Sequence, residues 1–196
     1  MPGTLNTQRA LVAGRGVVLL GAVNAPAPTL ANLTAFVANP ATFPTGFAPF
    51  GDTSAENLPE TEFEGGDVTF LSTWWVPNAD SIAEAVSQSY TVNALQFDND
   101  TMSLYSGGGD ATGAGIFWTP KSPVPTKASA LTIFVDKRDG QVRGMYNPQV
   151  AIRAADGISH ATDNYSEIPL RFSEEQHPSA KGPRAWIGAG FGTTTP

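Results

Sequence analysis

The stretch Leu58–Trp75, LPETEFEGGDVTFLSTWW, holds two runs of alternating polar and apolar residues on either side of Gly65-Gly66. Glycine accepts the positive φ angles of a two-residue turn, so the pattern predicts a β-hairpin that reverses at these glycines. Residues that pair across such a hairpin share a face. One predicted face carries Glu60, Glu62, Glu64, Asp67 and Thr69, and the other carries Thr61, Phe63, Val68 and Phe70.

The acidic face of this hairpin permits two interpretations. In the predicted pairing Glu64 lies opposite Asp67, and like charges in that position destabilise a hairpin. The simpler interpretation is an ordinary solvated face. The functional interpretation is a surface that stays hydrated and anionic while a negatively charged molecule passes it. The hairpin alone does not decide between them.

Composition restricts the class of protein. A chain of 196 residues is usually one domain, and its 20 glycines and 16 prolines favour short strands and turns over long helices. The net charge of −7 argues against binding of nucleic acid, which requires Lys and Arg to neutralise phosphates. The chain has no cysteine, which excludes disulfides and thiolate metal sites. The apolar run Gly16–Val23 is too short to span a bilayer, so we expect a soluble protein made in a cytoplasm.

One short α-helix is predicted over Asn99–Ser106. Asp98 or Asp100 can accept hydrogen bonds from the free N–H groups at its start, and Gly107 can take the left-handed conformation at its end. A second hairpin is expected to turn at Asp136–Gly140. Short strands along the whole chain predict a mainly β fold, a β-sandwich or partly closed barrel. The other expected strands are Gly16–Val23, Ser89–Phe97, Ala114–Trp118, Ala130–Val135, Gln141–Tyr146, Pro148–Ala155, Tyr165–Ser173 and Trp186–Phe191.

Three segments of this single predicted domain, residues 1–196, fall outside the strands. They are a polar N-terminal arm (1–15), a proline-interrupted segment (24–57) and a polar C-terminal tail (192–196). The segment 24–57 has room for a short helical turn near Thr29–Val37. A loop of this length in a compact domain is usually functional or disordered, and its aromatic residues favour function. Those aromatic residues are Phe36, Phe43, Phe47 and Phe50.

The sequence offers little for catalysis, and we predict no catalytic residue, metal or cofactor. His160 and His177 lack a second ligand-type residue at helical spacing, which makes a zinc site improbable. Ser159, His160 and Asp163 supply the residue types of a hydrolase triad, but they crowd within five positions and lack a nucleophile elbow. The acidic residues of Asp98-Asn99-Asp100 fit a helix cap better than a calcium loop.

The tryptophans support an alternative function. A β-sandwich module that binds carbohydrate or mediates adhesion would use Trp74, Trp75, Trp118 and Trp186 as a platform for stacking sugars. Positions in the core or in an interface are the favoured interpretation, because Trp74 and Trp75 are adjacent and would point to opposite faces of a strand.

Three segments, in this order and spacing, resemble the major tail (tail tube) proteins of long-tailed bacteriophages, and among these the proteins of phages of actinobacteria. They cover over half of the chain, between residues 45 and 155. The segments are GFAPFGDTSAENLPETEFEGGDVTFLSTWW (46–75), SYTVNALQFDNDTMSLYSGGG (89–109) and SALTIFVDKRDGQVRGMYNPQVAI (129–152).

The resemblance implies a β-sandwich with one flanking helix that assembles into stacked hexameric rings. Strands from each subunit would join in an inner β-barrel around a channel for DNA, and the arm (1–15), the long loop (24–57) and the tail (192–196) would bridge rings. The protein would be a structural part of the virion tail, assembled in the cytoplasm of the bacterial host. Its partners would be further copies of itself, the tape measure protein, and the tail initiator and terminator proteins, while DNA passes without specific binding.

The resemblance also assigns roles to residues. Candidate residues that line the lumen, where negative charge would repel DNA, are Glu60, Glu62, Glu64 and Asp67. Buried aromatics supply much of the binding energy of an interface. Candidate contacts between subunits or rings are therefore Phe36, Phe43, Phe47, Phe50, Trp74 and Trp75. The apolar residues over Thr69–Trp75 do not fit a strand that lines a lumen. They favour a place for this strand in an interface instead.

Overall fold

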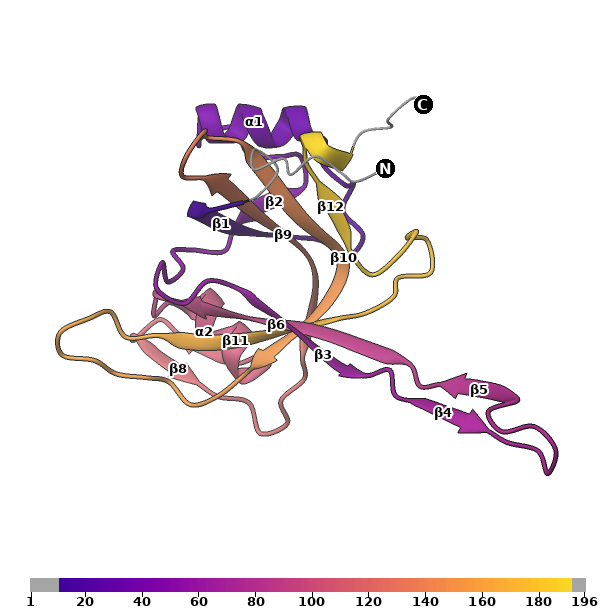
Figure 1. Cartoon of the computed structure of the whole chain (residues 1–196). Helices are drawn as coiled ribbons and strands as arrows, with labels where there is room; N and C mark the ends of the chain where they lie inside the picture. The colour runs from indigo at the N-terminus through magenta and orange to yellow at the C-terminus, as the bar shows by residue number, and fades with distance from the viewer. Residues whose placement is uncertain (1–10, 192–196) are drawn as a thin grey trace.

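The computed structural model describes residues 11–191, which hold twelve β-strands, two α-helices and one 3-10 helix (Figure 1). Most strands form one antiparallel sheet in the order β2-β1-β9-β10-β11-β6-β3, with β12 paired to β10. The mainly β class is confirmed. These strands are β1 (Ala13–Gly21), β2 (Phe47–Pro49), β3 (Glu60–Gly65), β6 (Val86–Ala94), β9 (Thr126–Asp136), β10 (Val142–Ala154), β11 (Ile168–Glu174) and β12 (Ala185–Ile187).

The long strand β10 joins two halves of this sheet. Its first part pairs with β9 and β12, and its last part, Val150–Ala154, pairs with β11. The register against β9 shifts between Asn147 and Val150, and such a bulge bends the strand. The bend lets the sheet enclose an apolar cluster. Its members include Val18, Tyr90, Val92, Met145, Ile152, Leu170 and Phe172.

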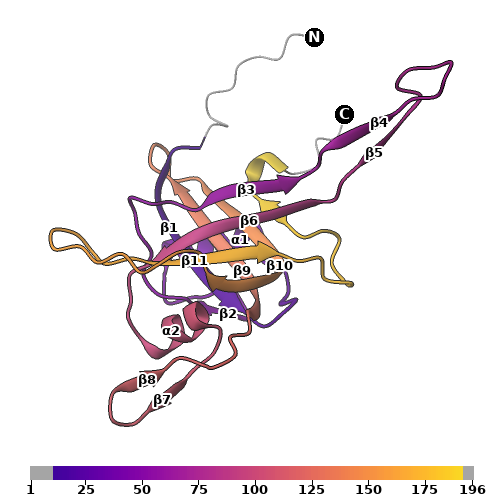
Figure 2. The ribbon, with the colours of Figure 1, turned by 90° about the horizontal axis from the view of Figure 1, so that it is seen from below.

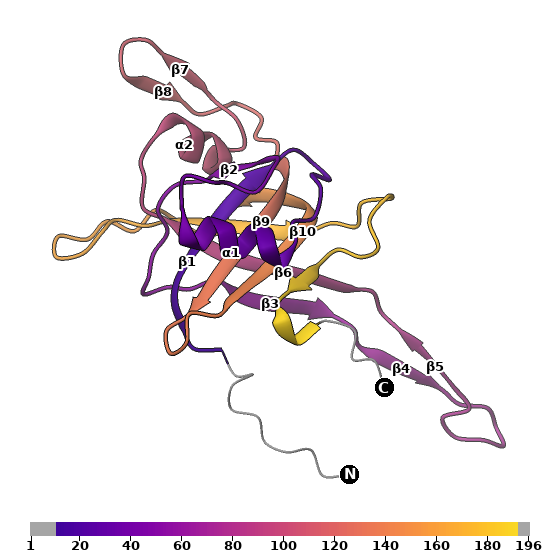
Figure 3. The same ribbon diagram turned by 90° about the horizontal axis from the view of Figure 1, so that it is seen from above.

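A second apolar cluster lies on the other face of β1, β9 and β10, under the helix α1 (Leu30–Ala38) (Figure 3). The hydroxyl of Thr29 accepts a hydrogen bond from the Asn32 N–H, and the Asn32 side chain accepts one from the Thr29 N–H. This capping box starts the helix inside the proline-interrupted segment. The prediction of a single flanking helix is therefore wrong, since α1 is a complete helix that buries Leu33 and Phe36.

The predicted helix is confirmed as α2 (Asn99–Ser106). The Asp98 carboxylate accepts a hydrogen bond of 2.8 Å from the Thr101 N–H, and Gly107 ends the helix at a φ of 67°. The hairpin expected at Asp136–Gly140 is confirmed between β9 and β10. Within residues 11–191, neither α-helix is long and apolar enough to cross a membrane.

The turn predicted at Gly65-Gly66 is wrong. β3 pairs with β6, and β4 (Val68–Leu71) pairs with β5 (Asp80–Ala83), so the chain passes through the glycines without reversing. The pairing keeps one register from Gly65–Val86 to Val68–Ala83, and the N–H of Glu84 donates to the carbonyl of Asp67 between them. Both glycines have the expected positive φ, which here only interrupts a strand. The reversal occurs over residues 72–79.

The outer part of this hairpin projects from the rest of the molecule (Figures 1 and 2). We call residues 66–85 the arm and residues 72–79, which connect β4 to β5, its tip. A smaller hairpin, β7 (Asp110–Thr112) with β8 (Ile116–Trp118), lies beside α2. The described chain ends in a 3-10 helix over Ala189–Phe191.

Candidate functional site

One face of the strands β3, β6, β11 and β10 is polar. Strand alternation turns Tyr90 and Phe172 into the core, so their neighbours point to the opposite side. We call that side the polar face. It consists of Glu60, Glu62, Glu64, Ser87, Ser89, Thr91, Asn93, Lys127, Ala151, Arg153, Pro169, Arg171 and Ser173. The prediction that the three glutamates share a face is confirmed. Asp67 lies beyond Gly65-Gly66, outside β3.

The charges on the polar face are mixed. The guanidinium of Arg171 donates hydrogen bonds to the carboxylates of Glu62 and Glu64, at 3.0 and 2.8 Å. It also donates two hydrogen bonds to the hydroxyl of Ser89 beneath it. Ion pairs this exposed each contribute about 0–1 kcal/mol to stability. Their effect is to hold the Arg171 side chain against the face, where two carboxylates surround it.

The polar face has an open strand at each side among the described residues. At one side, β3 pairs with β6 and is the last strand of the sheet. At the other side, the pairing of β9 with β1 stops at Ser129, so Thr126–Ala128 pairs only with β10. Open edges present unpaired N–H and C=O groups, and proteins normally block them or pair them with another chain.

The arm carries apolar side chains that the chain itself does not bury. Phe70 and Ile82 are 61% and 59% exposed, and Trp74 and Trp75 at the tip are fully exposed. Further exposed apolar residues on the arm are Val68, Leu71 and Val76. Contiguous apolar surface of this kind marks an interaction site in a soluble protein. The interface position that the sequence favoured for Thr69–Trp75 stays a prediction, and this exposure agrees with it.

The aromatic residues of segment 24–57 have a different location. Phe36, Phe47 and Phe50 are buried within the chain, which leaves little of their surface for contacts between subunits or rings, and that assignment stays a prediction. Phe47 meets Tyr146 edge to face at 6.2 Å, and α1 and β2 fold the segment onto the sheet. Phe43 is 40% exposed and contacts Phe36, so part of its ring is available.

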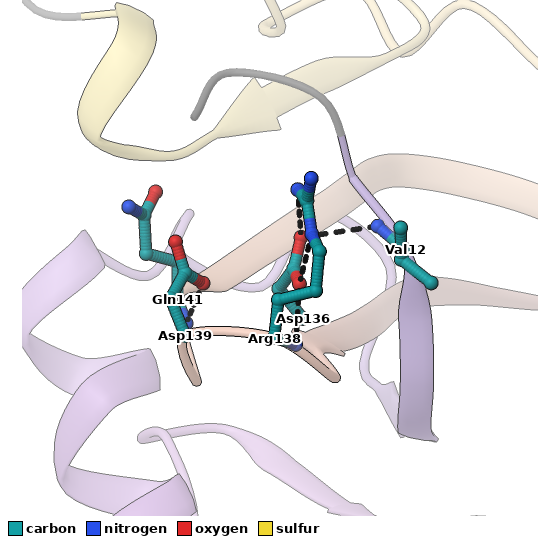
Figure 4. A network of polar contacts seen from close by, with 5 residues as sticks. All are labelled: Val12, Asp136, Arg138, Asp139 and Gln141. Carbon is teal, nitrogen blue, oxygen red and sulfur yellow. Dashed lines mark hydrogen bonds and ion pairs between the residues drawn. The ribbon is translucent and has the colours of Figure 1, made fainter. Parts of the chain in front are cut away.

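A polar network fixes the start of β1 to the β9–β10 turn (Figure 4). The Asp136 carboxylate binds the guanidinium and N–H of Arg138, and it accepts a hydrogen bond of 3.0 Å from the Val12 N–H. These bonds hold the pKa of Asp136 well below its usual range, with the Arg138 side chain as the largest cause. The Lys137 N–H also donates to the Val12 carbonyl.

This network bears on the predicted N-terminal arm (1–15). Its residues 13–15 belong to β1, and residues 1–10 lie outside the described part of the chain. The predicted tail (192–196) also lies outside it.

Residues 11–191 hold no group of three acidic or histidine side chains placed to bind a metal ion. The tryptophans lie on separate elements, the arm tip, β8 and β12, which Figure 1 shows far apart. They therefore form no common platform for stacking a sugar.

Sequence reasoning missed two features of these surfaces. Arg171 alternates with Leu170 and Phe172, so its face was predictable, but its pairing with Glu62 and Glu64 joins distant strands. The exposed apolar surface of the arm was indicated by its own sequence, because Val68, Phe70 and Leu71 place apolar side chains on both faces of β4. A strand of this kind needs cover on both sides.

Comparison of the sequence with known proteins shows the family to which the chain belongs. Residues 3–194 match the family described as phage tail tube protein. The chain belongs to the phage tail tube protein family. It is 31% identical over 187 residues to Major tail protein Gp23 of Mycobacterium phage D29, covering 93% of this chain and 92% of that protein. Major tail protein Gp23 of Mycobacterium phage L5 matches with the same identity and coverage. The resemblance seen in the sequence is confirmed. This tail tube protein is a structural component of the phage tail, and not an enzyme.

Proposed function

We propose that this tail tube protein polymerises into stacked hexameric rings, and that the resulting tube conducts the phage genome into the host. The observation that carries the proposal is a polar sheet face with an open strand at each side. Copies related by rotation can pair one edge with the other and close a barrel, which leaves no edge free. The polar face then lines the lumen.

The two edges carry side chains of opposite charge. β3 presents Glu60, Glu62 and Glu64, and the opposite edge presents Lys127, which pairs with Glu175 at 2.8 Å within the chain. Complementary charge across a joint favours the correct register and suppresses the pairing of two identical edges. We infer that β3 of one subunit pairs with the start of β9 in the next.

The lumen proposed here suits the passage of DNA without specific binding. Glu62 and Glu64 hold the guanidinium of Arg171, which limits its contact with phosphates. Glu60 adds an exposed carboxylate on the same face. The face carries these three glutamates against Lys127, Arg153 and Arg171, so it presents no excess of positive charge that would hold DNA phosphates in the channel. Asp67 is proposed at the end of this wall, where β3 gives way to the arm.

Contacts between rings are assigned to the arm in this proposal. Trp74 and Trp75 are its most exposed aromatic residues, and Phe43 is the exposed one in segment 24–57. The N-terminal arm (1–15) and the tail (192–196) are proposed to bridge rings as well. Further partners are the tape measure protein in the lumen and the initiator and terminator proteins at the tube ends. The tube would be assembled in the host cytoplasm.

Electron microscopy of the purified protein over a concentration series, beside its mass in solution, tests this function. We expect rings or hollow tubes above a threshold concentration. Seeds of purified tail tips supply an initiator if the protein alone stays monomeric. Monomers at every concentration, with and without seeds, would contradict the proposal.

A further inference from the structure

An apolar groove opens between α1 and the sheet, away from the tip of the arm. It has a volume of about 240 Å³ and is lined by Val17, Val37, Pro40, Ile133 and Val135. We call it the α1 groove. Small-molecule sites usually have volumes of about 300–1,000 Å³, so this groove fits one aromatic side chain better than a free ligand.

The tip is built to present aromatic side chains. The N–H of Thr73 donates to the carbonyl of Val76 at 2.9 Å, and the N–H of Val76 donates back to the Thr73 hydroxyl at 3.0 Å. The N–H of Asn78 donates to the hydroxyl of Ser72, which closes the turn from the other side. These bonds order the backbone around the two tryptophans before any partner binds. Order of this kind lowers the entropy cost of binding.

We propose that Trp74 and Trp75 of one subunit dock on the α1 groove of a second copy, with one indole filling it. This inference rests on the proposed tube. α1 covers the sheet at the top of the molecule in Figure 1 and lies nearest the viewer in Figure 3, and in both views the β4–β5 end of the arm projects well away from it. A projection on one part of the molecule and a groove on a different part can meet in a head-to-tail contact, which repeats from copy to copy.

Charge at the two surfaces agrees with this contact. Arg15 lines the groove and is exposed, and Asp80 begins β5 directly after the tip. An arginine beside this groove can pair with the carboxylate and also stack on the incoming indole. The contact is separate from the joint between β3 and β9, because it uses the arm and helix α1. It therefore connects copies in a different direction from the ring joint.

Disulfide trapping tests the contact, and the absence of native cysteine gives a clean background. The test variant combines Val76→Cys at the tip with Pro40→Cys at the groove. The control combines Val76→Cys with Thr112→Cys on the distant β7–β8 hairpin. Under mild oxidation of assembled tubes we expect a ladder of linked subunits from the test variant and none from the control. Tubes without this ladder would overturn the tip–groove contact and leave the proposed function standing.

A double-mutant cycle provides a second measurement. Trp74→Ala and Val37→Glu should each raise the concentration needed for assembly by at least about tenfold, as loss of a central interface contact does. The combined variant should be no worse than either single variant, because both remove one contact. Urea unfolding of the monomers checks that the fold is kept. Additive effects would overturn the pairing of these residues, and failure of the wild-type chain to assemble would refute the proposed function itself.

Discussion

Two hairpins of this tail tube protein have similar lengths and different surroundings. The β9–β10 hairpin buries Leu131, Ile133 and Met145 inside the chain, under α1 and against the bent sheet. The hairpin that ends in the arm leaves Phe70 and Ile82 exposed, with no second layer on either side among the described residues. A two-stranded hairpin alone is marginally stable in water. The difference supports the proposal that another subunit covers the arm.

The largest expected effect is the difference in monomer stability between a change in the buried core, here on β11, and a change on the arm. Phe172 is fully buried and stacks on Tyr90 at 5.1 Å, so Phe172→Ala should lower the free energy of unfolding by about 3–5 kcal/mol. Phe70→Ala on the arm should change it by no more than about 0.5 kcal/mol, yet should impair assembly. Urea unfolding of the monomers and microscopy of the assembled state measure both. A large loss of monomer stability in Phe70→Ala would remove the contrast.

A smaller effect is expected on the stability of the monomer at low pH, through Asp136. The pKa of Asp136 is lowered in the folded chain, so its bonds contribute stability at pH values above the ordinary pKa of about 3.9. That contribution is lost as the pH falls below 3.9 toward the lowered pKa of the folded state. Asp136→Asn should therefore destabilise the monomer at neutral pH and flatten its loss of stability in acid. Thermal unfolding between pH 7 and pH 2.5 measures this, and an unchanged pH profile would contradict it.

The smallest effect on assembly is expected on the polar face. Glu60→Gln, Glu62→Gln and Glu64→Gln together keep the side-chain shapes and should cost the monomer only about 0–1 kcal/mol per ion pair lost. In a phage they release Arg171 to bind phosphates, so tails should form but DNA ejection should slow. Adding Arg171→Gln should restore ejection. Normal ejection by the triple variant would place these residues outside the lumen.

Local patterns predicted the elements that depend on local interactions. The caps of α2 lie within a few residues of the helix, and both were predictable from Asp98 and Gly107. The glutamates of β3 share a face because alternation is a property of one strand, so the error at Gly65-Gly66 did not affect them. The errors arose where distant residues decide the structure. The partner of β3 is β6, which comes after the tip in the sequence. Phe36 is buried because α1 packs on β10.

Quenching of the fluorescence of Trp74 and Trp75 tests most directly whether neighbouring subunits bury the arm. In a Trp118→Phe, Trp186→Phe background the fluorescence comes from Trp74 and Trp75 alone. Acrylamide should quench it readily in the monomer, because both side chains are fully exposed there. In assembled tubes the same residues should be protected from acrylamide. Equal quenching in monomers and tubes would show that the arm stays in water, and would contradict the account.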